Sequence, residues 1–292
     1  MAKGRQLKRR IRSINNTRKI TRTMELVATS KLKRAMDRVA ATRPYAAALA
    51  EVISDLWTAE LANEYALLKH PVPIDKGGPT VVALLLITSN RGLAGAFNAN
   101  LIKEARRRIT ELESEGYTVA LHCVGKKGAG YFKYLGRALA GDRSDIGDVP
   151  EIAHAASLVD HLIENYAAGQ VAAVEVVQAR FESALSTPPA LVRLLPVAPP
   201  QRSGPRPDYI LRPDARTILE TLLPLYIRNV IYRALAETAA AEHAARRTAM
   251  KNATDNAGEI LRLLDRRYNR MRQAQITQEI AEIVGGAAAL ER

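Results

Sequence analysis

The sequence is poor in cysteine and in long apolar runs. Cys123 is the single cysteine among 292 residues, so the chain forms no internal disulfide and suits a reducing compartment such as the cytoplasm. The longest strictly aliphatic run, Val81–Ile87, is far shorter than the roughly 20 apolar residues that a membrane helix needs. No apolar segment follows the basic N-terminus, so we expect no secretory signal. We therefore expect neither a disulfide-rich secreted scaffold nor a membrane-spanning protein.

The motifs of nucleotide chemistry are also missing. A Gly-rich loop, Ser89–Gly95, follows the apolar run and precedes an expected helix, which is a common position for a phosphate site. This loop and a second one, Gly125–Gly130, lack both the P-loop spacing, with its Lys and hydroxyl, and the G-x-G-x-x-G spacing. Turn and capping chemistry accounts better for their glycines. A nucleotide-binding enzyme remains an alternative that depends on these two loops alone.

Metal-ligating and nucleophilic residues form no cluster in the sequence. The five histidines are scattered, and His154 and His161, two turns apart on one expected helix, have no Cys or carboxylate partners at metal-ligand spacing. Cys123 lies in an apolar segment and is interpreted as a core residue. The sequence therefore predicts no catalytic residue, no metal site, no cofactor and no direct small-molecule ligand.

Acidic residues are nearly absent from the first 43 positions. This segment holds 14 Lys or Arg against Glu25 and Asp37, whereas the rest of the chain carries 29 basic and 28 acidic residues. The formal net charge of +13 therefore lies almost entirely in the N-terminal segment. Such a surface attracts a polyanion, which the sequence leaves open as nucleic acid, an acidic protein surface or anionic lipid. A solvated helix face without a partner is the plainer alternative.

Both ends of the chain have the pattern of long helices. No Gly or Pro interrupts Arg5–Arg43, where one stripe in steps of three and four comprises Leu7, Ile11, Ile14, Thr17, Thr21, Met24, Ala28, Leu32, Ala35 and Val39. In the second helix the predicted stripe shifts register after Leu264 and comprises Met250, Ala253, Ala257, Ile260, Leu264, Tyr268, Met271, Ile276, Ile280 and Ile283. We predict that the two ends pair as a long antiparallel coiled coil. Pro44 is the expected place for a bend in the first helix, and Pro224 should bend the second or mark its start.

The middle of the chain changes to alternating strands and helices. Apolar runs predict strands at 81–87, 117–124 and 171–177, amphipathic segments predict helices at 98–115, 126–139 and 151–166, and a hairpin on a sheet edge is expected at 181–195. This alternation indicates a Rossmann-like α/β domain with a mostly parallel sheet. The predicted organisation is a coiled-coil helix (1–57), a linker (58–80), the inserted α/β domain (81–195), a Pro-rich linker (196–213) and a second coiled-coil helix (214–292).

Three blocks of the sequence resemble the gamma subunit of F-type ATP synthase. The first runs from Leu7 to Leu32, the second is Ser89–Asn98, and the third combines Ala249–Ala257 with Arg272–Ile280 and Ile283–Ala287. The blocks occur in the family's order and span essentially the whole chain. The resemblance implies a rotating central shaft, itself non-catalytic, that couples proton flow through a membrane ring to the conformational cycle of the catalytic beta subunits.

The resemblance also implies partners and contact residues. In this family the coiled coil fills a hexamer of alpha and beta subunits, while the α/β domain and the lower coiled coil bind the epsilon subunit and the membrane c-ring. The basic stripe is then expected to face acidic beta-subunit loops, in a peripheral membrane protein on the cytoplasmic face of the bacterial inner membrane. The expected partner-contact residues are Arg9, Arg10, Arg22, Met24, Arg246, Gln273 and Thr277, with the last three higher in the hexamer cavity.

Some positions depart from the family pattern. Asn90 stands where the family usually has Asp, Arg212 stands where Glu is common, and Pro224 is unexpected within the C-terminal helix. A rival function from another class is a nucleic-acid-binding coiled coil, whose basic stripe follows phosphates. Residues 1–43 contain no Phe, Tyr or Trp to stack on bases, so we expect no nucleic-acid partner.

Overall fold

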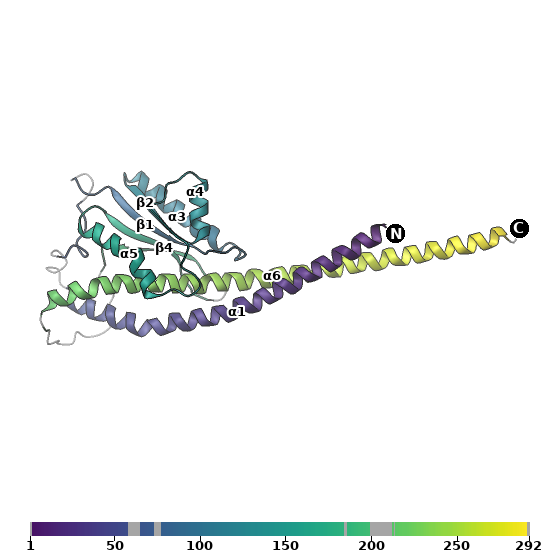
Figure 1. The fold of residues 1–292 in the computed structure, drawn as a ribbon, viewed down its shortest axis with the longest axis horizontal. Helices are drawn as coiled ribbons and strands as arrows, with labels where there is room; N and C mark the ends of the chain where they lie inside the picture. Colours follow the sequence, from purple (N-terminus) through teal and green to yellow (C-terminus); the bar gives the residue numbers. More distant parts are fainter. Residues whose placement is uncertain are drawn as a thin grey trace. The chain divides into compact units, whose positions relative to one another are not determined.

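The computed structural model describes residues 2–57, 65–72, 77–183, 186–198, 212 and 214–290. The elements, coloured along the chain in Figure 1, are α1 (Ala2–Leu56), β1 (Val81–Ile87), α3 (Phe97–Ser114), β2 (Thr118–Val124), α4 (Lys126–Tyr134), β3 (Gly141–Arg143), α5 (Ile152–Ala167), β4 (Ala173–Ala179), β5 (Pro189–Leu195) and α6 (Ala215–Leu290). The chain divides into two compact units. The terminal unit comprises the residues up to Ala28 and from Arg247 onward, and the central unit is Thr29–Arg246.

The central unit is built on a five-stranded sheet in the order β3-β2-β1-β4-β5. β1 pairs in parallel with β2 and β4, β2 pairs in parallel with β3, and β5 runs antiparallel to β4 at the other edge. Every residue of β1 after Val81 is buried, which is typical of a parallel strand covered on both faces. The predicted Rossmann-like α/β domain is therefore confirmed.

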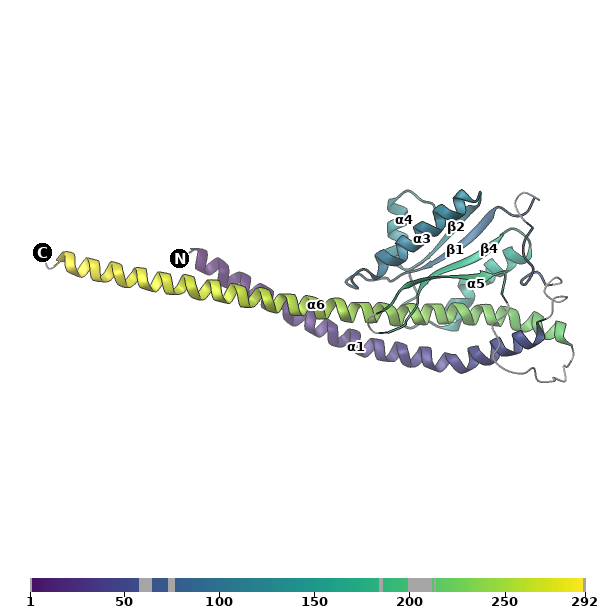
Figure 2. The same cartoon turned by 180° about the vertical axis from the view of Figure 1, so that it is seen from behind.

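Two helical layers cover the sheet of the central unit. On one face, α3 and α4 bury apolar side chains such as Leu101 and Phe132 against the strands. On the other face, α5 shares a core with the sheet and with the central-unit parts of α1 and α6, through residues such as Leu158, Ile53 and Ile227 (Figure 2). Burying a side chain of this size contributes roughly 1.5–3 kcal/mol. The helix pair and the α/β domain are thus joined by one apolar core.

Three details of the α/β domain differ from the predictions. The helix predicted at 126–139 ends at Tyr134 because Gly136, with a φ of 73°, turns the chain out of the helix. The short strand β3 has the polar sequence Gly-Asp-Arg, and the apolar pattern did not predict it. The predicted hairpin within 181–195 is wrong, since β5 pairs with β4.

The terminal unit pairs the beginning of α1 with the end of α6. The Thr254 hydroxyl donates a hydrogen bond to the Thr21 hydroxyl at 2.8 Å, and a Cβ atom on Gly4 would lie 3.3 Å from the Met271 side chain. Since an early residue of α1 meets a late residue of α6, the two helices run antiparallel. The predicted coiled coil is confirmed.

The seam of α6 is more regular than predicted. Leu261 is 7% exposed whereas Ile260 is 44% exposed, so Leu261 holds the seam position that the sequence analysis assigned to Ile260. Buried or half-buried residues follow in alternating steps of four and three at Met250, Thr254, Ala257, Leu261, Leu264, Tyr268, Met271 and Gln275. The register shift predicted after Leu264 is therefore wrong. An average repeat of 3.5 residues, the period of a left-handed coiled coil, runs through this segment.

Other residues of the predicted stripes are exposed. The Thr17 side chain on α1 is exposed, and its hydroxyl donates to a backbone carbonyl one turn earlier. On α6, Ile276, Ile280 and Ile283 are 47%, 56% and 71% exposed. The late part of α6 therefore carries an apolar surface that α1 does not cover.

The two long helices each contain a proline. The N-terminus of α6 is capped by Asp214, whose carboxylate accepts a hydrogen bond from the backbone N–H of Thr217 at 2.8 Å. Pro224 therefore lies inside α6 and does not mark its start, and Pro44 lies inside α1. No helix in the described part of the chain combines the length and apolarity needed to cross a membrane. The predicted linkers fall largely outside the described residues, and the domain boundaries stay predictions.

Candidate functional site

The two Gly-rich loops of the α/β domain bind each other. The first three backbone amides of α4, at positions 126–128, all donate hydrogen bonds to the loop that follows β1. Their acceptors are the Asn90 side chain at 3.0 Å, the Ser89 carbonyl at 3.1 Å and the Thr88 hydroxyl at 2.9 Å. A phosphate cradle needs such amides free. The second loop therefore offers no free amide at positions 126–128 to a phosphate.

Close packing explains two of the glycines in these loops. Gly125 has a φ of 93°, and a Cβ atom there would lie 2.2 Å from the Thr88 carbonyl oxygen. A Cβ atom at Gly128 would lie 2.9 Å from the Thr88 hydroxyl. Glycine is therefore required because the two loops approach each other closely, in addition to the turn chemistry that the sequence indicated.

Asn90 connects three segments at the carboxyl edge of the sheet. Its side-chain amide donates to the carbonyls of Ser144 at 3.0 Å and Ile146 at 2.9 Å, in the loop after β3, and its Oδ1 accepts from the Lys126 amide. An Asp at this position accepts the Lys126 bond but donates to neither carbonyl. The residue that departs from the family pattern thus matches its own surroundings.

We expect the substitution Asn90→Asp to lower the free energy of unfolding by about 1–2 kcal/mol, because it loses two donors and places a carboxylate against two carbonyls. Denaturant unfolding of the full chain measures this loss. Asn98→Asp is the matched control, since a carboxylate keeps the hydrogen bond that Oδ1 accepts from the Ser89 amide and loses only the one that Nδ2 donates to the Ser89 hydroxyl, so we expect a smaller loss. Equal losses for the two variants would contradict this account of Asn90.

A cavity of about 360 Å³ lies between these loops and α6. Its lining carries charges of both signs, from Arg91, Lys126, Asp148 and Glu242. A phosphate site needs an excess of donors and positive charge, so this mixed lining does not define one.

The other candidate chemical groups have structural roles. His154 accepts a hydrogen bond at Nδ1 from the Glu151 amide at 3.0 Å and so caps α5. Burial raises the pKa of the Cys123 thiol to about 12, so this thiol stays protonated at neutral pH. Within the described ranges, no group of three or more His, Cys, Asp or Glu residues is placed to hold a metal ion. No catalytic arrangement is assembled from these residues.

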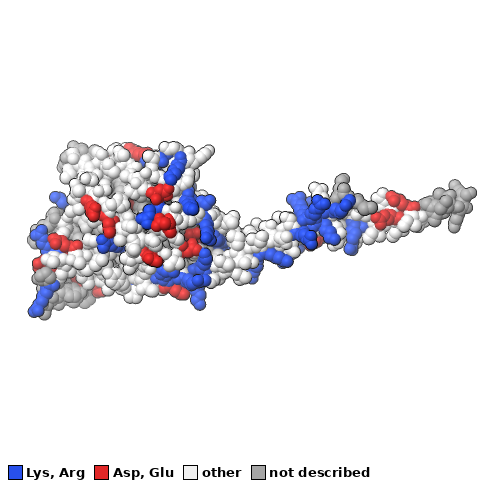
Figure 3. Space-filling view, in the orientation of Figure 1, with Lys and Arg blue, Asp and Glu red and all other residues white. Residues whose placement is uncertain are grey.

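The terminal unit carries most of the net positive charge. It holds 17 Lys or Arg against seven Asp or Glu, and Lys and Arg side chains gather along it on the face drawn in Figure 3. Arg9 and Arg10 are exposed, and the Arg22 side chain is 59% exposed while it pairs with Glu25 at 2.9 Å. Met24 is half-buried, two residues after Arg22. All four predicted contact residues lie on the terminal unit, with Arg9 and Arg10 roughly 20 Å from Arg22 and Met24 along α1.

Arg246 has a different environment, in the central unit. Its side chain is 11% exposed and donates to the Glu242 carboxylate at 2.6 Å and to the Gly92 carbonyl at 3.2 Å. Gln273 and Thr277 are exposed on the terminal unit, where the Thr277 hydroxyl donates to the Gln273 carbonyl. Arg246 thus belongs to the central unit, whereas Gln273 and Thr277, which were predicted to contact the same part of the hexamer cavity, belong to the terminal unit. The contact role of all seven residues stays a prediction.

His243 lies buried beside Arg246. Burial lowers the pKa of this imidazole to about 4, although the charge of Asp148 acts in the opposite direction. The Arg246 guanidinium is 3.4 Å from His243 Nδ1, so the neutral ring accepts there and carries its proton on Nε2. At neutral pH His243 is therefore an uncharged member of this cluster.

Replacing His243 with Asn is expected to reduce the acid sensitivity of folding. The histidine binds a proton more readily in the unfolded chain, so it lowers stability as pH falls from about 6.5 to about 4, by roughly 1–3 kcal/mol in all. Burial raises the pKa of Glu242, so this residue instead adds stability as pH falls. We therefore compare the change in unfolding free energy across this pH range between the variant and the wild type, in which the contribution of Glu242 cancels. Parallel pH profiles of the two proteins would show that His243 contributes nothing.

The fold and its surfaces define a class of protein: an antiparallel coiled coil with an inserted α/β domain and a basic terminal unit. A family model described as ATP synthase matches residues 3–290. An ATP synthase gamma chain from Gemmatimonas aurantiaca is 61% identical, with 100% of both chains covered, and one from Frankia casuarinae is 43% identical over 98% of this chain and 97% of that relative.

Solved structures agree with this comparison at the level of the fold. A chain in the Euglena gracilis mitochondrial ATP synthase structure containing OSCP, F1 and c-ring has a TM-score of 0.69 at 19% identity, covering 99% of this chain and 95% of that one. A chain of the Tetrahymena thermophila mitochondrial ATP synthase central stalk and c-ring has a TM-score of 0.59 at 23% identity, covering 80% and 99%. The chain belongs to the ATP synthase gamma chain family. It is a subunit of an ATP-synthesising, membrane-associated complex of bacterial type.

Proposed function

We propose that the chain is the central rotor shaft of the F1 sector of a proton-translocating ATP synthase. Proton flow turns a membrane c-ring, the ring turns this chain, and the chain drives each catalytic beta subunit in turn through its binding states. In physical terms the shaft is a ligand that favours different conformations of otherwise equivalent sites. The observation that carries this proposal is 61% identity over the full length to a gamma chain.

The chain performs no chemistry itself in this proposal. The engaged amides at positions 126–128 support this, because they are not free to bind the phosphates of a nucleotide. The partners are the alpha and beta subunits of the hexamer, the epsilon subunit and the c-ring. The complex lies on the cytoplasmic face of the bacterial inner membrane, with this chain as a peripheral subunit.

The basic terminal unit faces acidic loops of the beta subunits. Exposed Arg9, Arg10 and Arg22, together with Met24, form the contact with these loops. Gln273 and Thr277 make polar contacts higher in the cavity of the hexamer. Arg246 reaches the same partners only if it exchanges part of its bonding to Glu242 and Gly92.

Reconstitution of the complex with and without this chain tests the function. We expect vesicles with the complete complex to make ATP from an imposed proton gradient, and vesicles with a complex lacking this chain to make none. Purification from detergent-solubilised membranes gives a second readout, since the chain should accompany an ATP-hydrolysing assembly. Tight, salt-sensitive binding of RNA without any such assembly would support the nucleic-acid alternative and contradict the proposal.

A further inference from the structure

The loop that follows β3 reaches both long helices of the central unit at one residue, Asp148, in addition to the apolar core that joins these helices to the α/β domain. Its carboxylate accepts a hydrogen bond from Lys31 Nζ on α1 at 2.5 Å, and its backbone carbonyl accepts one from Arg38 on the same helix at 3.3 Å. On α6, His243 Nε2 lies 3.8 Å from the same carboxylate. All of these residues belong to the central unit. We call Lys31, Arg38, Asp148 and His243 the clasp.

The same loop is bound to the sheet. Asn90, in the loop after β1, donates to the carbonyls of Ser144 and Ile146, four and two residues before Asp148. Beside it, the Gly92 carbonyl accepts from Arg246 on α6. Hydrogen bonds therefore connect the loop after β1 to the loop after β3. The loop after β3 is bonded to α1, and the loop after β1 is bonded to α6.

Apolar packing near the clasp consists largely of small side chains. The buried cluster there is formed by Leu32 and Ala35 on α1 and by Ala240 and Ala244 on α6, and the partly buried Phe181, from the segment after β4, packs against it. Alanine lets the helices approach closely but forms shallow ridges, which interlock less than large side chains do. Directed contacts therefore add to the resistance to sideways displacement between these helices. Asp148 supplies them from a loop of the α/β domain.

We propose that Asp148 is a positioning residue that makes the α/β domain and the two helices turn as one body. This inference rests on the proposed function, in which torque enters through the α/β domain and leaves through the coiled coil. Lys31 and Arg38 hold Asp148 to α1, and the position of His243 keeps α6 beside it. Without the clasp, torque rotates the α/β domain relative to the two helices. A smaller part of each rotation of the domain is then transmitted to the hexamer.

The test is Asp148→Asn in the assembled complex in proton-tight vesicles, where gradient-driven ATP synthesis and ATP hydrolysis are both measured. Asp142→Asn is the matched control, because Asp142 makes a similar ion pair with Lys133 at 2.6 Å, with comparable exposure, but within the α/β domain. We expect Asp148→Asn to lower synthesis about fivefold, because Asn keeps an acceptor for Lys31 but lacks the charge that makes this hydrogen bond strong. Hydrolysis should fall less, and Asp142→Asn should remain within twofold of wild type.

A cross-link distinguishes positioning from a general structural role. Cysteines introduced by Lys31→Cys and Asp148→Cys are joined with a short bifunctional thiol reagent, which buried Cys123 does not intercept. We expect the joined variant to recover synthesis to within twofold of wild type, and the same variant before joining to behave like Asp148→Asn. Wild-type coupling in Asp148→Asn, or a joined variant that stays uncoupled, would overturn the clasp. Synthesis that persists when the whole chain is omitted would instead overturn the proposed function.

Discussion

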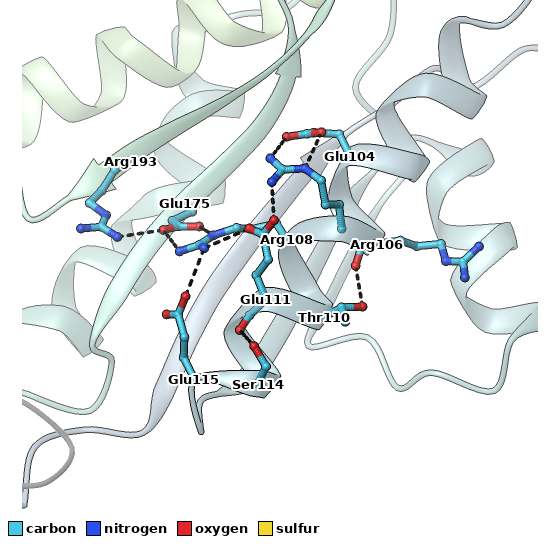
Figure 4. A network of polar contacts seen from close by, with 10 residues as sticks. Glu104, Arg106, Arg108, Thr110, Glu111, Ser114, Glu115, Glu175 and Arg193 are labelled. Atoms are coloured by element: carbon cyan, nitrogen blue, oxygen red, sulfur yellow. Dashed lines mark hydrogen bonds and ion pairs between the residues drawn. The ribbon is translucent and has the colours of Figure 1, made fainter.

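Replacing Arg108 with Met is expected to lower the free energy of unfolding by about 3–5 kcal/mol, because it leaves a buried carboxylate without its main partner. That carboxylate belongs to Glu175, which is 2% exposed and lies on β4, next to the central strand β1. Arg108 on α3 binds it at two points, at 2.7 and 2.9 Å, and Arg193 on β5 binds it at 3.2 Å (Figure 4). Urea unfolding of the full chain measures the loss.

The neighbouring arginine provides the control. Arg107→Met removes an exposed guanidinium that pairs with Glu104 and Glu111 on the surface of the same helix, and we expect little measurable change. The double substitution Arg108→Met with Glu175→Gln should recover part of the loss, because no uncompensated charge then remains. Similar stabilities for Arg107→Met and Arg108→Met would contradict the role of this network.

Acid also weakens this network. Burial alone would raise the pKa of Glu175, but the hydrogen bond and charge of Arg108, with those of Arg193, outweigh burial and lower it. A carboxyl group whose pKa is lowered by folding stabilises the protein above its unfolded pKa and loses that contribution as pH falls through the folded value. The stability that Arg108 adds should therefore be full at neutral pH and decrease in strong acid.

Reversing the charge of Arg9, Arg10 and Arg22 to Glu is expected to reduce gradient-driven ATP synthesis by tenfold or more. Like charges placed against acidic loops cost several kcal/mol, and about 1.4 kcal/mol corresponds to a factor of ten. All three side chains are exposed, but Arg22 pairs with Glu25, which is only 9% exposed, so its reversal also lowers the stability of the chain. The comparison is made in the reconstituted complex, with thermal unfolding of the variant chain measured beside it.

Three exposed basic residues on α3 offer a control with the same change in net charge. Lys103, Arg106 and Arg107 are exposed residues of the central unit, whereas Arg9, Arg10 and Arg22 belong to the terminal unit. Their reversal should leave the coupling of ATP turnover to proton movement near wild type. If reversal on the terminal unit also leaves coupling unchanged while the complex assembles, the electrostatic contact is wrong.

The elements with strong local patterns were predictable from sequence. β1 is one continuous apolar run because both of its faces are covered, and its predicted bounds agree with the structure. β3 has three residues at a sheet edge and no apolar pattern, so only its pairing with β2 defines it. The 181–195 hairpin failed for a related reason, since a strand pattern does not identify the strand that pairs with it.

The coiled-coil register shows a second limit. Ile260 and Leu261 are adjacent and both apolar, so hydrophobicity alone did not decide which residue lies in the seam. Requiring an unbroken 3.5-residue repeat over the whole segment selects Leu261 and places Ile276 and Ile280 on the exposed side. The sequence did not predict the contacts of Asp148. This residue lies in a loop, and its partners Lys31 and His243 are brought to it only by the tertiary fold. The residues that contact the partner subunits were predicted from the family resemblance, and these contacts stay predictions.

Direct observation of rotation tests the central claim. With the hexamer fixed to a surface, a probe is attached to a cysteine introduced by Lys103→Cys on the exposed face of α3, while buried Cys123 remains unlabelled. We predict that adding ATP makes the probe turn continuously in one direction relative to the hexamer. A probe that stays still while the same labelled complexes hydrolyse ATP would contradict the assignment of this chain as the rotor shaft.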